Sequence, residues 1–357
     1  IYVGGGRSNG GHHHDSVIKY DTFSDSWINV GALPEIKYGA DATVLNGYIF
    51  VISGNNSISL SDKVYAADIT PPMDLYYRES NASGTITLDK LSTVLAGEFA
   101  SSTAVRTPVG LVSAVDYKDD APSDHTILER TDRNATHEWE EMAPIPTSLQ
   151  VYDGIEVVDG KIYCIGGYDG SSALDTTYRY DPVSGSWETL ASMQLVRSGM
   201  SSAVLDGKVY AISGQNAGYQ HLTVEVYNPS TNQWTYGPQV SQMIRQGAAI
   251  TIDGRLFVMG GIDPQNSNSS SNLVWELNEE RTQWISRSSM PVAKHGIKLV
   301  AFEGKILVYS GNVLQVYHVA SDAWEVKSGP NISQHYPVFW KDYNALFMGG
   351  GISGDSF

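Results

Sequence analysis

The sequence predicts an all-β protein in which one four-stranded sheet is repeated along the chain. Three recurring marks indicate this: a short apolar strand ending in two small residues, a tryptophan seven positions after an aromatic or aliphatic residue, and an Asp-Gly or Asn-Gly pair. Copies of these marks return at a spacing near 50 residues. A self-similar period of this length is typical of proteins that stack copies of one structural unit.

The apolar strand with its small doublet is expected to be the second strand of each unit. It recurs at residues 1–5, 49–54, 162–167, 209–214, 256–261, 306–311 and 345–350. The second small residues at 167, 214, 261 and 311 are spaced 47, 47 and 50 apart, and the interval of 113 between 54 and 167 fits two units, one of them degenerate. Since the strand is apolar on both faces, both faces of the sheet should be covered.

The other two marks predict hairpins. The spacing of seven joins a third and a fourth strand in five places: Tyr20/Trp27, Tyr180/Trp187, Tyr227/Trp234, Leu277/Trp284 and Tyr317/Trp324. Turn-forming residues such as 181–185 lie between the partners, as expected for a hairpin loop. Pairs such as Asp206-Gly207 predict a tight turn between the first and second strands, because both central positions need a positive φ.

Repeated sheets that bury both faces against copies of themselves close into a propeller. The doublets, the Tyr–Trp spacing and the period resemble kelch repeats, which implies a kelch-type β-propeller over residues 1–357 as a single domain. We expect seven four-stranded blades, with six or eight as alternatives, since residues 1–6 and 345–350 both fit a second-strand position. The pattern is degenerate over 58–140, where 63–68 resembles a third strand without its Trp, Trp139 ends a further blade, and 70–97 is an irregular insertion.

Composition excludes several classes of protein. The 39 acidic and 23 basic residues give a net charge of −16, which disfavours nucleic acid and anionic membranes as partners. The longest apolar runs are about five or six residues, far below the ~20 needed to span a bilayer. The single cysteine, Cys164, excludes an internal disulfide and is expected to be a buried strand residue. The chain begins in the middle of a unit, so residues upstream are expected to be missing.

The main candidate binding site is a ring of residues before the inner strands, which line the channel of a propeller. Each stands two positions before a glycine, or before Pro337 in the last unit: Lys37, Tyr152, Arg197, Arg245, Lys294 and His335. Four of the six are basic, and a cationic ring on an acidic body would draw anions to the channel mouth. Arginine also suits carboxylates in bidentate geometry. The alternative is a structural role, in which these side chains bond carbonyl groups of the connecting loops.

Two weaker patterns concern metals and glycans. His12, His13, His14 and Asp15 are a weak candidate for a metal site. Adjacent residues on an extended loop point in alternate directions, so a solvated loop is the main alternative and we expect no cofactor. Five sequons place candidate glycosylation sites in predicted loops, at Asn55, Asn81, Asn134, Asn268 and Asn331. Together with the acidic, lysine-poor composition they favour an extracellular or cell-surface protein.

These patterns favour a non-enzymatic recognition or scaffold module. It would bind a protein or a glycan, an acidic ligand included, through the loops and the ring of six residues at the channel mouth, which we call the rim. It could also assemble into a larger extracellular complex, and we expect neither nucleic acid binding nor membrane insertion. The resemblance to kelch repeats implies that this rim carries ligand contacts. The kelch family also includes enzymes. The copper radical oxidases of this family need a Tyr cross-linked to a Cys near the copper at the channel mouth, and the place of Cys164 on a second strand argues against that activity. A sialic-acid mutarotase-like site is the alternative: Arg197, Arg245 and Lys294 would hold a sugar carboxylate, and His295, His335 or Asp153 would move the proton.

Overall fold

The computed structural model describes strands, turns and loops in residues 2–4, 7–8, 15–21, 26–37, 39–68, 75–78, 105–107, 110–114, 125–130, 139–242, 245–263, 269–302, 304–310, 313–328, 334–335, 341–342 and 345–346. Over these ranges the chain is all-β, and no helix is long and apolar enough to cross a membrane. Contacts divide the chain into two compact units. One comprises 1–45, 49–66 and 139–357, and the other comprises 46–48 and 67–138.

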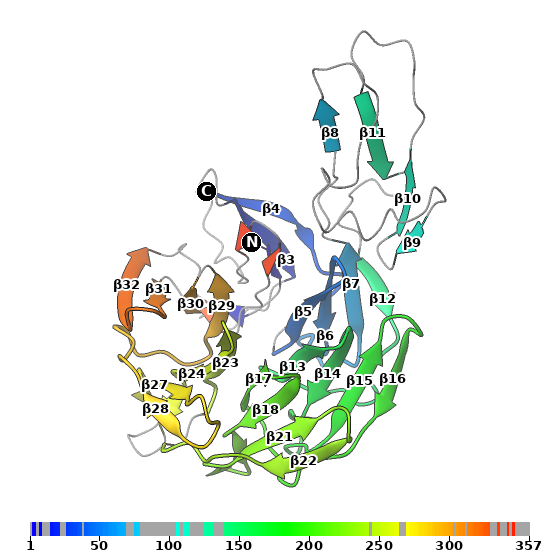
Figure 1. Ribbon diagram of the computed structural model, residues 1–357. Helices are drawn as coiled ribbons and strands as arrows, with labels where there is room; N and C mark the ends of the chain where they lie inside the picture. The colour runs from blue at the N-terminus through cyan, green and yellow to red at the C-terminus, as the bar shows by residue number, and fades with distance from the viewer. Residues whose placement is uncertain are drawn as a thin grey trace. The chain divides into compact units, whose positions relative to one another are not determined.

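Five sheets of the first unit share one strand order and form consecutive blades of a propeller (Figure 1). The first blade consists of β5 (Asp41–Leu45), β6 (Tyr48–Ile52), β7 (Val64–Asp68) and β12 (Trp139–Met142). The second blade consists of β13 (Ile155–Val158), β14 (Lys161–Ile165), β15 (Thr177–Asp181) and β16 (Ser186–Thr189). The third is β17 (Ser201–Leu205), β18 (Lys208–Ile212), β21 (Val224–Asn228), β22 (Gln233–Tyr236). The fourth blade consists of β23 (Ala248–Ile252), β24 (Arg255–Met259), β27 (Val274–Leu277) and β28 (Trp284–Ser286). The fifth blade consists of β29 (Lys298–Phe302), β30 (Lys305–Ser310), β31 (Val313–His318) and β32 (Ala323–Ser328).

The first strands of the blades are the inner strands, and they follow one another around the propeller. β5 contacts β13, β13 contacts β17, β17 contacts β23 and β23 contacts β29. Short hairpins extend two loops beyond the blades: β19 (Gln215–Asn216) with β20 (Tyr219–Gln220), and β25 (Ile262–Asp263) with β26 (Ser269–Ser270). Side chains that lie close along the axis can therefore come from distant parts of the sequence.

The N-terminal strands form a three-stranded sheet of β1 (Tyr2–Gly4), β3 (Ser16–Asp21) and β4 (Ser26–Ala32). β1 takes the second-strand position beside β3, whereas β35 (Ala345–Leu346) pairs with β34 (Lys341–Asp342). β2 (Arg7–Ser8) pairs with β33 (Gln334–His335). The described residues thus hold five complete blades and this N-terminal sheet, fewer than the seven blades that the sequence favoured.

The repeat pattern misplaced one strand. β7 lies next to β12 in the first blade, so Trp139 belongs to the same blade as residues 63–68. The interval between 54 and 167 therefore contains one blade with a long insertion between its third and fourth strands, and not two blades. The inserted segment has its own sheet of β8 (Leu75–Arg78), β11 (His125–Arg130), β10 (Gly110–Ala114) and β9 (Val105–Thr107). It makes up most of the second compact unit.

Each sequence mark corresponds to a contact. Asp206 and Gly207 turn between the first two strands with φ of 52° and 69°, as the Asp-Gly pattern predicted. Tyr227 stands opposite Trp234 in the hairpin of β21 and β22, with ring centroids 5.1 Å apart. The Trp234 indole also donates a 3.0 Å hydrogen bond to the carbonyl oxygen of Ala191, in the connection that leads from the preceding blade. The indole groups of Trp187, Trp284 and Trp324 donate to carbonyl oxygens of other connections in the same way, so the tryptophans link neighbouring blades.

The glycine doublets lie where a blade approaches the connections beside it. Gly166 and Gly167 have φ of 57° and 106°, in the region that favours glycine. A Cβ on Gly166 would lie 2.8 Å from the carbonyl oxygen of Arg197, and one on Gly167 would lie 2.7 Å from that of Gln150. The neighbouring strand residue Cys164 is buried, as expected. The doublets thus have a packing role that needs no ligand.

Candidate functional site

The loops after the doublets and the connections between blades lie at one end of the sheets. Isolated bridges join them, from Leu174 to Arg197, from Ser198 to Gln215 and from Arg245 to Ile262. Since the strands are antiparallel, the other hairpin turns lie at the opposite end. We call the first end the loop face, and it comprises the described residues of 53–63, 166–176, 213–223 and 260–273 and of the connections 33–40, 143–154, 190–200, 237–247 and 287–297.

The loop face is rich in serine, asparagine, glycine and tyrosine. Its loops include residues 55–59 (Asn-Asn-Ser-Ile-Ser), 168–172 (Tyr-Asp-Gly-Ser-Ser) and 215–219 (Gln-Asn-Ala-Gly-Tyr). Two apolar tips extend into solvent: the Ile58 side chain is 93% exposed and that of Tyr219 is 79% exposed. Antibody paratopes combine adaptable polar groups with rigid aromatic anchors in the same way. This composition suits reversible binding of a macromolecule.

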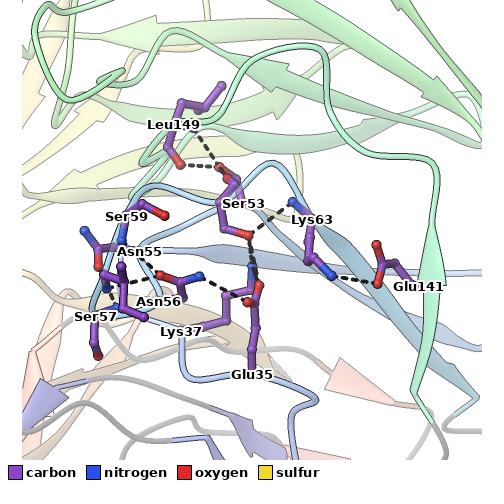
Figure 2. A network of polar contacts seen from close by, with 12 residues as sticks. Glu35, Lys37, Ser53, Asn55, Asn56, Ser57, Ser59, Lys63, Glu141 and Leu149 are labelled. Carbon is purple, nitrogen blue, oxygen red and sulfur yellow. Dashed lines mark hydrogen bonds and ion pairs between the residues drawn. The ribbon is translucent and has the colours of Figure 1, made fainter.

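The first-blade loop is held in shape by its own asparagines (Figure 2). The side-chain oxygen of Asn55 accepts a 2.8 Å hydrogen bond from the amide of Ser57. That of Asn56 accepts bonds from the amides of Ile58 at 3.2 Å and of Ser59 at 3.0 Å. The tip that presents Ile58 is therefore ordered before any ligand arrives, which lowers the entropic cost of binding.

Lys37 lies beneath this loop and is only 1% exposed. Its ammonium is 2.7 Å from Oε1 of Glu35, donates a 2.8 Å hydrogen bond to Oγ of Ser61, and lies 5.3 Å from the Tyr65 ring centre. Burial alone would raise the pKa of Glu35, but the hydrogen bonds from Lys37 and Ser61 lower it below its usual value. Burial lowers the pKa of Lys37, against the attraction of Glu35. This contact fits the structural alternative for Lys37.

Arg197 has the same role in the third blade and is fully buried. Its guanidinium donates hydrogen bonds to the carbonyl oxygens of Ser213 at 2.7 Å and Thr223 at 3.1 Å, and its contact with Oε1 of Glu225 is 2.6 Å. The other carboxylate oxygen of Glu225 accepts a 2.6 Å bond from the amide of Gln194. Burial lowers the pKa of Arg197. Arg197 therefore joins the blade connection to the loop 213–223 and does not face solvent.

The predicted rim residues occupy three different positions of the connections. One residue with φ near +60° precedes each inner strand: Gly39 (64°), Tyr152 (60°), Gly199 (57°), Gln246 (57°) and Gly296 (58°). Lys37, Arg197 and Lys294 lie two residues before it, Arg245 lies one residue before it, and Tyr152 is that residue. Counting from the nearest glycine in the sequence mixed these positions, because Gln246 and Tyr152 take the left-handed conformation where other blades have glycine.

Arg245 and Lys294 are the basic rim residues that keep partial exposure. Arg245 donates a 2.9 Å hydrogen bond to Oε1 of Gln215, and its buried Nε has no partner among the described residues. The Lys294 side chain is half-buried, and its backbone pairs with the amide of Gly261 at 2.8 Å. His295, next to it, shares a 2.8 Å hydrogen bond between Nδ1 and Oγ of Ser270. Of the four basic rim residues, Arg245 and Lys294 thus keep surface in contact with solvent.

The other candidate residues have the following places. The Tyr152 hydroxyl donates a 3.0 Å hydrogen bond to Oε1 of Gln150. His335 lies on β33 opposite Arg7 of β2. Asp15 is exposed, and its carbonyl oxygen accepts a 2.6 Å bond from the amide of Leu33. His12, His13 and His14, and the sequon residues Asn81, Asn134, Asn268 and Asn331, lie outside the described residues.

A charged cluster that is separate from the predicted rim residues lies at the start of the inner strands. The Lys298 ammonium donates hydrogen bonds to Oδ1 of Asp41 at 2.8 Å, Oδ1 of Asp153 at 2.9 Å and the carbonyl oxygen of Tyr152 at 2.7 Å. Beside it, Oγ of Ser202 lies 2.6 Å from Oε1 of Glu156. Within the described ranges, no three side chains of His, Cys, Asp or Glu are placed to hold a metal ion. We call Asp41, Asp153, Glu156, Ser202 and Lys298 the axial cluster.

One signal for the axial cluster was present in the sequence. The inner strands β5 and β29 begin with charged residues, Asp41 and Lys298. The equivalent positions of β17 and β23 hold the uncharged residues Ser201 and Ala248. Charged residues of opposite sign at one inner-strand position predict an ion pair once the ring is known. Asp153 had been considered only as a proton carrier for a sugar substrate. In the structure Asp153 forms an ion pair with Lys298.

Comparisons with known proteins agree with this architecture. Models of the kelch motif match residues 154–194, 197–241 and 245–291. Kelch repeat and BTB domain-containing protein 1 of cowpox virus (strain Brighton Red) is 26% identical over 210 residues, which are 55% of this chain and 28% of that protein. Kelch-like protein 35 of Mus musculus is 28% identical over 181 residues, 50% of this chain and 27% of that protein. The chain thus spans less than a third of the length of these relatives.

A solved structure shares the fold across nearly the whole chain. The structure of YjhT matches with a TM-score of 0.62 and covers 90% of this chain and 92% of its own. The sequence identity is 13%, so the likeness concerns the fold alone. The repeats, the relatives and this match agree on a kelch-type propeller.

Proposed function

We propose that this chain, a β-propeller with kelch motifs within residues 154–291, is a non-enzymatic recognition module that binds a protein ligand at the loop face. One observation carries the proposal. Ile58 and Tyr219 stand exposed on two loops whose backbones are already fixed, by asparagine side chains in one and by the β19–β20 hairpin in the other. Rigid apolar anchors surrounded by polar groups are the usual centre of a protein interface.

The ligand of this proposal carries an acidic segment. Arg245 and Lys294 belong to neighbouring blades, and both keep exposed surface beside the loops. The chain as a whole is strongly acidic, with a net charge of −16, so exposed cations are the places where an acidic ligand is attracted. Such an arrangement contributes more to orientation and specificity than to total affinity.

A carbohydrate-active enzyme is less well supported. Arg197 was one of three basic residues expected to hold a sugar carboxylate, but its guanidinium is buried against Glu225. A cation with its own buried carboxylate partner is poorly placed to take another one. The proposal therefore assigns Arg245 and Lys294 to ligand contacts and no residue to catalysis.

The proposal also places the module outside the cell or on the cell surface. Among the described residues, Asn55 is the sequon asparagine, and it lies on the loop that carries Ile58. Expression through a secretory pathway, with glycosidase digestion of wild type and Asn55→Gln, tests this setting by mass. An unmodified secreted chain would remove the sequon argument.

The test uses a displayed random peptide library and a glycan array as probes. Peptides selected on wild type should lose about tenfold in affinity for Ile58→Ser and for Tyr219→Ser, which corresponds to about 1.4 kcal/mol for each anchor. Val183→Ser is the matched control, because Val183 is 87% exposed on a turn at the opposite end of the second blade. Binding of glycans alone, or equal loss in the control, would contradict the proposal.

A further inference from the structure

The axial cluster contains a hydroxyl group with two neighbours and one proton. Oγ of Ser202 lies 2.6 Å from Oε1 of Glu156 and 3.0 Å from the carbonyl oxygen of Asp153. A serine hydroxyl can donate only one hydrogen bond, and a backbone carbonyl can only accept. When Glu156 is protonated it can donate to Ser202 while Ser202 donates to Asp153, so each contact has a proton of its own. When Glu156 is ionised, the single Ser202 proton has to be shared between both oxygen atoms.

We propose that Glu156 carries a proton at neutral pH, and that this proton makes the axial cluster a pH-sensitive fastening between the second and third blades. Glu156 lies on β13 of the second blade, and Ser202 lies on β17 of the third. The bond between them therefore crosses from one inner strand to the next. This inference rests on the geometry of the axis and does not depend on the proposed ligand.

The charges around Glu156 favour the proton. Asp41 on β5 and Asp153 before β13 supply two carboxylates, whereas Lys298 on β29 supplies a single ammonium that both already share. β17 and β23 contribute no ionisable residue. Tyr163 on β14 stands opposite Glu156 in register, and Cys164 beside it is buried. An ionised Glu156 would thus be a third negative charge next to one positive charge.

Burial acts in the same direction on both acids. It raises the pKa of Glu156 to about 8, although a Ser202 hydroxyl that donates to the carboxylate favours the ionised form. It raises the pKa of Asp153 to about 6, with the charge of Lys298 acting against the rise. Burial also raises the pKa of Asp41, again against Lys298. Asp153 and Lys298 therefore remain an ion pair near neutral pH, where Glu156 is neutral.

The sign of the pH effect follows from where the proton binds more tightly. The pKa of Glu156 is higher in the folded protein than its usual value of 4.5, so the folded state holds the proton more strongly. The corresponding stability is fully present below about pH 4.5 and is lost as the pH rises through about 8. Deprotonation of Glu156 also places a negative charge beside Asp153. The residue before Asp153 is Tyr152, whose carbonyl oxygen accepts a hydrogen bond from Lys298. Alkaline pH should therefore loosen this part of the loop face.

Infrared difference spectroscopy on the full chain tests the proton directly. Subtracting the spectrum of Glu156→Gln from that of wild type at pH 7 should leave the carbonyl band of a protonated carboxylic acid, which vanishes above pH 9. Glu279→Gln is the matched control, since Glu279 is exposed, and it should leave a carboxylate band. A carboxylate band for Glu156 at pH 7 would overturn the proposal.

Stability and a wild-type titration complete the test. The urea midpoint of wild type should fall between pH 5.5 and 9 by more than that of Glu156→Gln, because glutamine keeps a donor toward Ser202 and cannot ionise. Equal falls in the two proteins would contradict the proposal. If Glu156→Gln does not fold, carboxyl-¹³C-glutamate NMR of wild type decides: one glutamate must titrate near pH 8, and its absence overturns the inference.

Discussion

Lys298, at the start of β29, donates a 2.8 Å hydrogen bond to Asp41, at the start of β5 and 257 residues earlier in the chain. The same ammonium reaches Asp153 before β13, so one side chain of the fifth blade holds the first and second blades together. The contact is buried, with side-chain exposures of 9% and 8%. A single charged group thus links inner strands that are far apart in the sequence.

Removing the ammonium should be costly. Lys298→Met leaves Asp41 and Asp153 buried without their cation, and loss of one partner from a buried ion pair typically costs about 3–5 kcal/mol. Urea unfolding of the full chain measures this as a lower midpoint. Lys208→Met is the control, because Lys208 is exposed at the start of β18 and should change the stability by less than about 0.5 kcal/mol. A loss no larger than in the control would mean that the axial cluster does not hold the blades together.

Replacing both members of the buried pair Arg197 and Glu225 should lower the stability less than replacing Arg197 alone. Arg197→Met alone leaves a buried carboxylate without its cation and should cost about 3–5 kcal/mol. Adding Glu225→Leu should recover part of that loss, because the amides of Gln194 and Leu195 then lose their acceptor. The fourth blade supports this, since Trp275 stands opposite Val258 in the place that Glu225 takes opposite Ala211. A double-mutant cycle by urea unfolding measures the coupling. A double variant as unstable as the sum of the single variants would show that the two residues act independently.

The sequence predicted those parts of the fold that are set by neighbours in the chain. Tyr227 and Trp234 face each other because a short hairpin turn puts them opposite, and Asp206-Gly207 turns by its own backbone preference. The sequence did not predict contacts between residues that a long insertion separates. Trp139 lay far from its third strand, so the spacing of seven could not assign it.

The candidate site was harder to predict than the fold. Arg245 was aligned with Arg197 by a nearby glycine, but the left-handed residue of its connection is Gln246. Arg197 and Lys37 were basic residues beside a channel, and only the coordinates show that their charges are used inside the protein. The pairing of Lys298 with Asp41 depends on how the ring closes. No local pattern contains that information.

The inserted segment should be removable from the first blade. Replacing residues 69–137 by Pro-Val-Ser-Gly, the turn of residues 182–185 in the second blade, would bring Ala67 and Trp139 to the spacing of seven seen elsewhere. Since β7 already lies beside β12, we expect the shortened chain to fold, with the near-ultraviolet circular dichroism and cooperative unfolding of wild type. Extending the deletion to residue 142 removes β12, exposes the edge of β7 and should cause aggregation. Loss of tertiary signal in the first variant would show that the blade needs the insertion.

Glu276 should make the fourth blade sensitive to acid. Burial alone would raise its pKa, but hydrogen bonds from Arg255, at 2.7 and 2.8 Å, and from Arg287, at 2.6 Å, lower it below the usual 4.5. The folded state therefore binds this proton less tightly than the unfolded chain. The resulting stability is present above about pH 4.5 and is lost as the pH falls through the lowered folded value. Urea midpoints between pH 6 and 3 should fall more steeply for wild type than for Glu276→Gln, while Glu279→Gln should follow wild type. Parallel curves for all three proteins would show that the two arginines do not stabilise the charged form of Glu276.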